Sequence, residues 1–374
     1  MKMILKRHTA YVLIAAVILL ALIAGLINLL QSEVIDQNIF AQENINVSRS
    51  PLTNINDNPY HGRVAVDYII FLNDNFNDRF SYTMQEMHTA VWLVEELLAM
   101  GFSWDDIEVQ EFISSESEAM ENTDFFINWF IILDNSPFAN FGARSSKMSQ
   151  NIVLTLPGQS EEVIVVGAHY DSVFYPGASD NASGVALMLE SAQRMMNLNH
   201  YYTIKYVFFG AEELGLYGSF HYVNNLTQAE HENILFMVNS DILLEGESLF
   251  YMAGYDANGE SGANHITETW DAIAKEINTH YSINLIPWPE AIFGPSDQLA
   301  FLPKGHTVML LMGLDGEKVA TTDVNTVIFD MARVVHSPRD DIHYILQEWP
   351  DKANANMHGF SLFLDEILLA AYEY

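Results

Sequence analysis

The hydrophobic pattern of the chain is dominated by short apolar runs that end abruptly in polar residues. Residues 163–168 form such a run, without any alternation of polar and apolar positions. Unbroken runs of this length are typical of strands covered on both faces, as in a parallel sheet flanked by helices. Further runs of strand character lie at residues 203–209, 235–240 and 307–312. The pattern therefore predicts an α/β fold around a buried sheet.

Apolar residues at helical spacing lie around these runs. They predict helices over residues 84–100, 185–196 and 360–371, the first of which is ended by Gly101. Two further strands are predicted over residues 107–112 and 151–156. Because the sequence shows no internal repeat and no sign of a second domain, we expect a single folded domain over residues 61–374.

Polar residues suited to a metal site follow the run at residues 163–168. His169 comes directly after it and Asp171 two residues later, where an extended chain would place both side chains on one side. One could bind a metal while the other orients it, since a ligating imidazole commonly gives its second N–H to a carboxylate. Asp180 lies in a turn before the next helix, where a carboxylate could bridge two ions. A His-x-Asp pair alone is also typical of an ordinary polar strand end.

Two more apolar runs end in carboxylates. Glu212 and Glu213 follow the run at residues 203–209, and Asp241 follows the run at residues 235–240. Neighbouring side chains diverge in extended or turn geometry, so one glutamate could hold a metal while the other faces the substrate water. Taken alone, the pair would be interpreted as a surface acidic pair. Because strand ends of one parallel sheet are neighbours in space, we expect these residues to cluster with the histidine.

His336 is a further ligand candidate, beyond the last apolar run. It lies near Pro338, which marks a loop, and either Asp340 or Asp341 could orient its ring. Most other histidines lack a carboxylate at matching spacing near a strand end. We interpret as structural or exposed the residues His61, His200, His221, His231, His265, His280, His306, His343 and His358.

The composition limits which side chains can act as metal ligands or nucleophiles and which partners the protein can bind. The 374 residues include no cysteine, which removes thiolate zinc sites and cysteine nucleophiles and leaves histidine, aspartate and glutamate as metal ligands. The formal net charge of -33 at pH 7 argues against nucleic acid and against an anionic lipid surface as partners. The ordinary reason for such acidity is solubility, or tolerance of salt outside the cell.

A membrane anchor is expected near the N-terminus. Residues 9–30 carry no charge and are long enough to cross a bilayer as a helix. The basic residues that precede them are Lys2, Lys6 and Arg7. Since the next basic residue is Arg49, the positive-inside rule predicts a cytoplasmic N-terminus and an extracellular remainder. The alternative is a cleaved signal peptide, with a late cut after Ala41, although its apolar region would normally be shorter.

The chain is thus expected to have three parts. Residues 1–31 form a cytoplasmic stub and a transmembrane signal anchor. Residues 32–60 are polar, contain Pro51 and Pro59 and lack periodicity, as expected of an extracellular linker. Residues 61–374 form the folded domain that carries the candidate ligands.

The polar segments, taken together, resemble a known family. GAHYDS, GASDNASG, FFGAEELGLYGS, NSD and HSPRD follow one another as in the di-zinc exopeptidases typified by secreted bacterial leucyl aminopeptidases. That family also contains glutamate carboxypeptidase and glutaminyl cyclase. The resemblance covers roughly residues 80–370. It implies a mixed, mostly parallel β-sheet sandwiched between α-helices, and a zinc peptidase catalytic domain over residues 61–374.

The resemblance also implies a role for each polar residue. Two zinc ions would be held by five ligands, namely His169 and Asp241 for one ion, Glu213 and His336 for the other, and Asp180 bridging the two. Glu212 would be the general base, and Asp171 would orient His169. Two zinc ions about 3.5–4 Å apart can share a hydroxide, lower its pKa and clamp the scissile carbonyl group. Manganese and cobalt suit the same ligands as substitutes.

The function implied is a membrane-anchored extracellular aminopeptidase, which hydrolyses N-terminal residues of peptides by metal-bound hydroxide. The first alternative is a glutaminyl-cyclase-like acyltransferase with a single zinc ion. The second is a non-catalytic, peptidase-like binding ectodomain. The complete ligand set favours two metals and hydrolysis.

Two motifs depart from the family pattern. Val335 stands where many relatives carry tyrosine, so another group, or the metals alone, must stabilise the oxyanion. Ser296, Asp297 and Gln298 stand in place of an SDH motif, and neither departure affects an implied ligand. Residues 251–262 and 286–294 are expected to form the walls of the substrate pocket, and their apolar content favours apolar N-terminal residues.

Overall fold

A computed structural model describes residues 60–113, 148–253, 264–287, 296–316 and 333–372. The predicted anchor and nearly all of the predicted linker lie outside these ranges, as do most residues of the two expected pocket walls. No helix within the described ranges is both long enough and apolar enough to cross a membrane. All described residues belong to one unit, Arg49–Tyr374.

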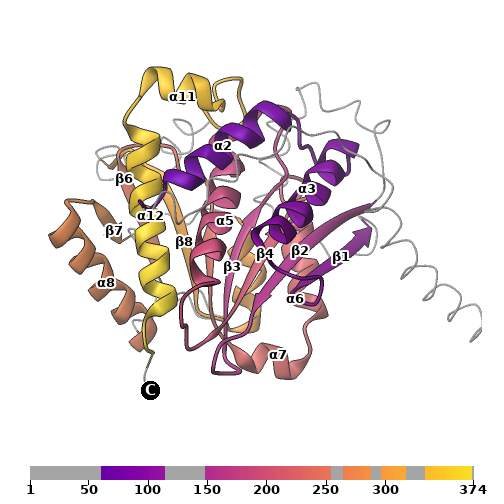
Figure 1. The fold of residues 1–374 in the computed structure, drawn as a ribbon, viewed down its shortest axis with the longest axis vertical. Helices are drawn as coiled ribbons and strands as arrows, with labels where there is room; N and C mark the ends of the chain where they lie inside the picture. The colour runs from indigo at the N-terminus through magenta and orange to yellow at the C-terminus, as the bar shows by residue number, and fades with distance from the viewer. Residues whose placement is uncertain (1–59, 114–147, 254–263, 288–295, 317–332, 373–374) are drawn as a thin grey trace, which may run out of the picture. The chain divides into compact units, whose positions relative to one another are not determined.

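The described residues form an eight-stranded sheet with the strand order β1-β2-β4-β3-β5-β8-β6-β7 (Figure 1). The strands are β1 (Ile107–Ile113), β2 (Met148–Leu156), β3 (Val163–His169), β4 (Thr203–Phe209), β5 (Ile234–Ser240), β6 (Ser248–Ala253), β7 (Leu285–Pro287) and β8 (Val308–Leu314). The central strands β4, β3, β5 and β8 are parallel, whereas β2 and β6 join them as antiparallel neighbours. The expected mixed, mostly parallel sheet is confirmed.

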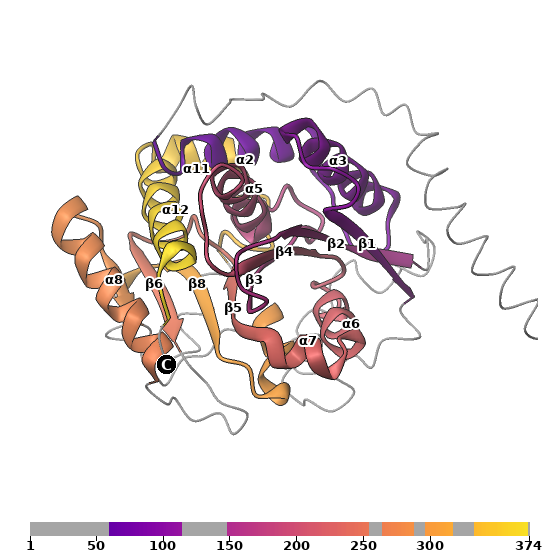
Figure 2. The same ribbon diagram turned by 60° about the horizontal axis from the view of Figure 1, so that its bottom comes forward.

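Helices cover both faces of this sheet. They are α2 (Arg63–Asn75), α3 (Met84–Met100), α5 (Ser183–Met195), α6 (Tyr217–Asn225), α7 (Gln228–Asn233), α8 (His265–Tyr281), α11 (Ile342–Glu348) and α12 (Lys352–Leu369). Figure 2 shows α2, α3, α5 and α12 on one face and α6 and α7 on the other. Helix α8 packs against β7 and α12. The short 3-10 helices η3 (Asp297–Ala300) and η4 (Leu302–Lys304) precede β8.

The central strands are apolar because the helices cover both of their faces. Every residue of β8 is buried, and in β3 and β5 only the first residue is partly exposed. A strand in this position has no solvent-facing side, so its sequence shows no alternation. For this reason the apolar runs predicted β3, β4, β5 and β8 with bounds that agree within two residues.

The last helix is longer than its apolar periodicity predicts. α12 begins at Lys352 rather than at residue 360. In the part that periodicity missed, Asn356 is buried, and its Nδ2 donates hydrogen bonds to the carbonyl oxygens of Leu243 and Glu245 at 3.0 and 3.3 Å. Because an inward-facing position is polar here, the hydrophobic pattern does not reveal the first turns of the helix.

The parallel strands deliver their last residues to one edge of the sheet. In the β3–β4 pair, His169 lies opposite Phe209, the last residue of β4. In the β3–β5 pair, Gly167 lies opposite Asn239, next to the last residue of β5. The segments that follow these three strands therefore start side by side, as the carboxyl ends of parallel strands do in open α/β sheets.

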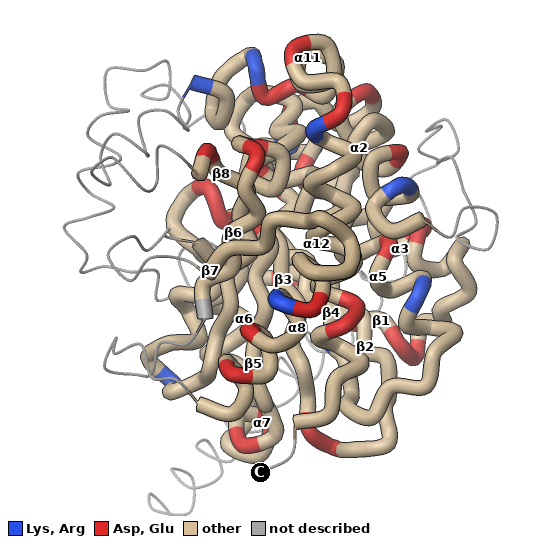
Figure 3. Tube along the Cα trace, turned by 90° about the vertical axis from the view of Figure 1, so that its left-hand side faces the viewer, with Lys and Arg blue, Asp and Glu red and all other residues tan. Residues whose placement is uncertain are grey.

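Acidic residues occur throughout the chain, 49 against 16 basic residues. Figure 3 shows acidic positions on many of the described elements, α3 and α11 among them, with few basic positions between them. A distribution of this kind raises solubility through self-repulsion and does not by itself mark a binding site.

Candidate metal centre

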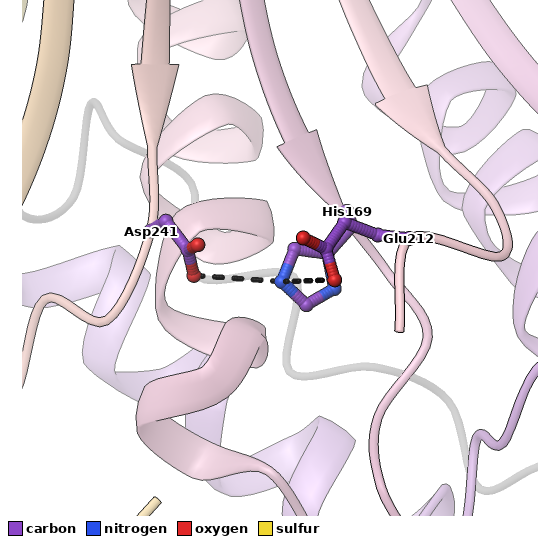
Figure 4. A group of neighbouring side chains, drawn as sticks. All are labelled: His169, Glu212 and Asp241. Carbon is purple, nitrogen blue, oxygen red and sulfur yellow. Dashed lines mark ion pairs between the residues drawn. The ribbon is translucent and has the colours of Figure 1, made fainter. Parts of the chain in front are cut away.

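Three strand ends bring the predicted ligands together. His169 is the last residue of β3, Glu212 and Glu213 follow β4, and Asp241 follows β5. Figure 4 shows the side chains of His169, Glu212 and Asp241 pointing toward one another from these three places. The predicted clustering of strand-end residues is confirmed, and its cause is the parallel pairing of β3 with both β4 and β5.

Asp180 lies between the two histidines. Its Oδ1 is 3.1 Å from Nε2 of His169, and its Oδ2 is 3.0 Å from Nε2 of His336. Each carboxylate oxygen therefore faces a different imidazole, which is the arrangement expected of a carboxylate that joins two metal positions. His336 comes from the loop before α11, far from the other ligands in sequence.

The remaining carboxylates divide between the same two histidines. Oδ1 of Asp241 is 3.4 Å and Oε2 of Glu212 is 4.0 Å from Nε2 of His169. Oε2 of Glu213 is 3.1 Å from Nε2 of His336. The adjacent glutamates thus turn toward different histidines, as the divergence of neighbouring side chains predicts.

These residues fit a site for divalent cations with nitrogen and oxygen ligands. Potential ligand atoms of His169, Glu212 and Asp241 lie within 4.8 Å of one another, and so do those of His169, Asp180 and Glu213. Oε1 of Glu213 is buried and makes no hydrogen bond within the described part of the chain. Buried carboxylate oxygens require a partner, and a bound cation is one that this ligand set would hold.

Burial and mutual charge perturb the acid–base properties of the site. Burial opposes charge on His169, but Glu212 and the hydrogen-bonded carboxylates outweigh it and raise the pKa of His169 well above its ordinary value. Burial raises the pKa of Glu212 well above its usual range, despite the nearby His169. Burial, together with the charge of Asp180, raises the pKa of Glu213 to about 7. Perturbed titratable groups that cluster in this way are typical of functional sites.

Asp171 is completely buried beside His169. Its Oδ1 is 3.4 Å from Nδ1 of His169, and its backbone oxygen is 3.2 Å from the same nitrogen, so it lies where an orienting residue is expected. The carboxylate also accepts hydrogen bonds from the backbone N–H groups of Glu212 and Glu213 at 3.1 and 3.2 Å, and from Ser81 Oγ at 2.5 Å. Asp171 therefore connects the end of β3 with the loop that carries both glutamates.

Asp180 lies in the turn η2 (Ala178–Ala182). The backbone of this turn is bound by Asp340, which was expected near His336 instead. Asp340 accepts hydrogen bonds from the backbone N–H groups of Ser179 and Asp180 at 2.6 and 3.1 Å. Asp341 instead caps α11, since its Oδ1 accepts from His343 N at 2.9 Å. The hypothesis that one of these two aspartates orients the ring of His336 is wrong in both cases.

The positions that depart from the family pattern are buried. Val335 packs into an apolar cluster with Ile242, Phe250 and Leu310, so its side chain is part of the hydrophobic core. Ser296 and Gln298 both accept hydrogen bonds from Asn239 Nδ2 at 2.8 Å, which ties η3 to the end of β5. These contacts stabilise the packing around the sheet, and none of them involves a proposed metal ligand.

Sequence reasoning missed a set of buried polar residues behind the ligands. Arg79, Ser81 and Glu86 come from the connection between α2 and α3 and from the first turn of α3, and all three are buried. The signal that was available is the pair of charged residues, Arg79 and Glu86, in a stretch whose neighbours are largely core residues. The partners that link them to the site are not visible from spacing, because Tyr170 lies 91 residues from Arg79 and Ser149 lies 63 residues from Glu86.

Comparison with known proteins identifies relatives of this arrangement. The model of "Peptidase family M28" matches residues 151–361, a little over half of the chain. Aminopeptidase YwaD of Bacillus subtilis is 33% identical over 213 residues, which are 55% of this chain and 42% of that protein. The matched segment therefore spans less than half the length of that curated relative.

Solved structures share the fold. A zinc aminopeptidase from Bacillus subtilis superimposes with a TM-score of 0.60 at 18% identity and covers 82% of this chain and 95% of its own. A glutaminyl cyclase from Fimbriiglobus ruber superimposes with a TM-score of 0.59 at 17% identity, covering 83% and 95% of the two chains. At these identities the likeness concerns the fold, which agrees with the mixed sheet described above.

Proposed function

Because this chain belongs to peptidase family M28, we propose that it is a zinc-dependent aminopeptidase that removes N-terminal residues from peptides. The observation that carries the proposal is the position of Asp180, whose two oxygens face His169 and His336 separately at 3.1 and 3.0 Å. A carboxylate placed in this way provides for two metal positions rather than one, which favours hydrolysis over a single-zinc acyl transfer.

The described residues would hold two zinc ions, with manganese or cobalt as substitutes. The proposed ligands are His169 and Asp241 for one ion, Glu213 and His336 for the other, and Asp180 for both. Bound at these positions, the ions would supply Lewis acidity to the scissile carbonyl group and lower the pKa of water. Asp171 keeps the ring of His169 in place through the contact of its Oδ1 with Nδ1.

Glu212 is the proposed general base. Its carboxylate lies 4.0 Å from Nε2 of His169, farther than the carboxylates of Asp180 and Asp241, and 12% of its side chain is exposed. It can therefore accept a proton from the attacking water and return it to the leaving amine. Proton transfer by a positioned carboxylate contributes about 10²–10⁴-fold to turnover.

Metal analysis and a substrate panel test the proposal together. The purified domain, residues 61–374, is expected to contain close to two zinc ions per chain and to hydrolyse aminoacyl anilides of the panel, releasing the free amino acid and the aniline. Removal of the metal with a chelator should abolish this hydrolysis, and added zinc should restore it. Saturation at one zinc ion, together with cyclisation of N-terminal glutamine, would favour the glutaminyl-cyclase-like alternative. Two bound zinc ions without hydrolysis or cyclisation would favour a binding ectodomain.

We further propose that residues 9–30 anchor the protein in the membrane, with the peptidase domain outside the cell. The uncharged stretch and the basic residues on only its N-terminal side support this topology. Treatment of intact cells with a protease should therefore release the domain, while a cytoplasmic marker protein stays intact. Recovery of the domain only after lysis would contradict the topology without affecting the proposed chemistry.

A further inference from the structure

One short segment reaches both loops that carry the proposed ligands. It runs from Arg79 to Glu86, between α2 and the first turn of α3, and it lies outside the part of the chain matched by the family model. Arg79, Ser81 and Glu86 are exposed by 0%, 3% and 1%. Polar side chains are buried to this extent only when their hydrogen bonds are satisfied, so their partners define what the segment does.

Arg79 binds the backbone of the loop at residues 170–177, which connects the end of β3 to the turn η2. Its Nε donates to the carbonyl oxygen of Tyr170 at 2.7 Å. Nη1 donates to Pro176 O at 2.5 Å and Nη2 to Gly177 O at 3.1 Å. A single guanidinium group therefore joins the two ends of the loop. These ends directly follow His169 and closely precede Asp180.

The planar fork of the guanidinium suits this task. Five N–H donors in fixed directions can reach carbonyl groups on both sides of the loop, which an ammonium group on a flexible stem cannot do in the same way. The backbone approaches closely at Gly177, where φ is +54° and an added Cβ would collide with the carbonyl oxygen of Asp180 and crowd Nη2 of Arg79. The contact thus depends on a glycine at the start of the turn.

Ser81 and Glu86 hold the second loop in a similar way. Ser81 Oγ donates to Asp171, whose carboxylate accepts from the backbone N–H groups of Glu212 and Glu213. Glu86 Oε1 accepts from Ala211 N at 3.0 Å, where the backbone has a positive φ of 52°. The backbone just ahead of the two glutamates is therefore bound from the same segment that binds the loop at residues 170–177.

The charge of Arg79 also complements the ligand cluster. Burial lowers the pKa of its guanidinium to about 10, against the opposing influence of carboxylates that include Asp340, Asp171 and Asp180. The group is therefore charged at neutral pH. Its hydrogen bonds described above go to neutral carbonyl groups, so the charge acts on the carboxylates of the site through space.

We propose that Arg79 is a positioning residue for the metal centre, which sets the separation of His169 and Asp180 by clamping both ends of the loop between them. The inference rests on the proposed metal centre and adds to it a residue that binds neither metal nor substrate. Residues that orient ligands in this way typically contribute 10–100-fold to metal affinity. A loop held at only one end would let the two ligands move apart and would weaken zinc binding.

Titration of metal-free protein with zinc tests the proposal, with the zinc affinity measured by isothermal titration calorimetry. Arg79→Gln removes the fork and the charge, and it is expected to weaken zinc affinity by about 10–100-fold. Arg79→Lys keeps the charge without the fork and is expected to remain clearly weaker than the wild type. It is also the variant to use if Arg79→Gln does not fold. Circular dichroism checks that each variant is folded at the temperature of the titration.

Arg194→Gln is the matched control. Arg194 is another largely buried arginine, 3.1 Å from Glu190 and 3.5 Å from Asp365, and its loss is expected to lower thermal stability while leaving zinc affinity unchanged. Wild-type zinc affinity in a folded Arg79 variant would overturn the inference, and so would an equal loss of affinity in Arg194→Gln. If the wild-type protein itself bound no zinc, the proposed function would fail first, so the two failures are distinguishable.

Discussion

Replacing Glu212 by glutamine removes a proton acceptor from the site while keeping the size and polarity of the side chain. If Glu212 is the general base, turnover should fall by about 10²–10⁴-fold. Each factor of ten corresponds to about 1.4 kcal/mol, so the barrier would rise by roughly 3–5 kcal/mol. Since substrate binding does not require this proton transfer, the loss should appear in kcat with little change in KM.

The structure determines what should happen to the metal in this variant. Glu212 lies 4.0 Å from Nε2 of His169, whereas Asp180 and Asp241 lie 3.1 and 3.4 Å from the same nitrogen. Two carboxylates are thus better placed than Glu212 to share a metal position with this histidine. Zinc content in Glu212→Gln is therefore expected to stay near two ions per chain.

Glu213→Gln is the matched comparison, because it makes the same chemical change one residue further along. Glu213 lies 3.1 Å from Nε2 of His336, and only 5% of its side chain is exposed. This variant should lose zinc and activity together. The assay is hydrolysis of an aminoacyl anilide under saturating and limiting substrate, with zinc measured on the same samples by atomic absorption.

Two outcomes would refute the assignment of Glu212. One is the loss of a zinc ion in Glu212→Gln, which would make the residue a ligand, a role that its distance to His169 and Asp241 also permits. The other is near-normal turnover at full zinc content. In that case the base would be another carboxylate, such as the buried Asp297, whose pKa burial raises to about 7.

Asp180→Ala is expected to weaken zinc binding at both positions, whereas His169→Ala and His336→Ala should each affect one position more than the other, since Asp180 faces both rings. Calorimetric titration of the three variants distinguishes these patterns, and equal losses in all three would contradict a bridging role. His306→Gln should reduce the loss of stability in acid. Burial and the nearby His231 lower the pKa of His306 from 6.5 to about 4, so below pH 6.5 the unfolded chain binds a proton that the folded chain does not. Stability from this group therefore falls as pH decreases from 6.5 to about 4. Urea unfolding at pH 7 and pH 4.5 measures the difference, and parallel losses in both proteins would show that His306 does not contribute.

The central strands and most of the site could be predicted from the sequence for one physical reason, whereas β6 and β7 were not predicted. A strand covered on both faces must be apolar along its whole length, so β3 and β8 appear as unbroken runs with clear ends. Parallel strands of one sheet end at one edge, and for this reason His169, the glutamate pair and Asp241 could be expected to meet. The apolar runs and the polar residues that follow them can both be identified directly in the sequence.

The resemblance to a family added what periodicity could not supply. His336 lies in a loop without helical or strand periodicity, and nothing in its neighbours indicates that its ring faces Asp180 and Glu213. The ordered motifs implied that contact, and the distances of 3.0 and 3.1 Å agree with it.

Only the tertiary structure decided which buried polar side chains support the site. Asp340 binds the turn that presents Asp180, rather than the ring of His336, and Arg79 joins two ends of a loop more than ninety residues further along the chain. Hydrophobic periodicity reports whether a position faces the core, but it carries no information about the partner that a buried polar group meets there. That choice is made by long-range packing, because each buried donor or acceptor must find a partner among the groups that the fold brings near it.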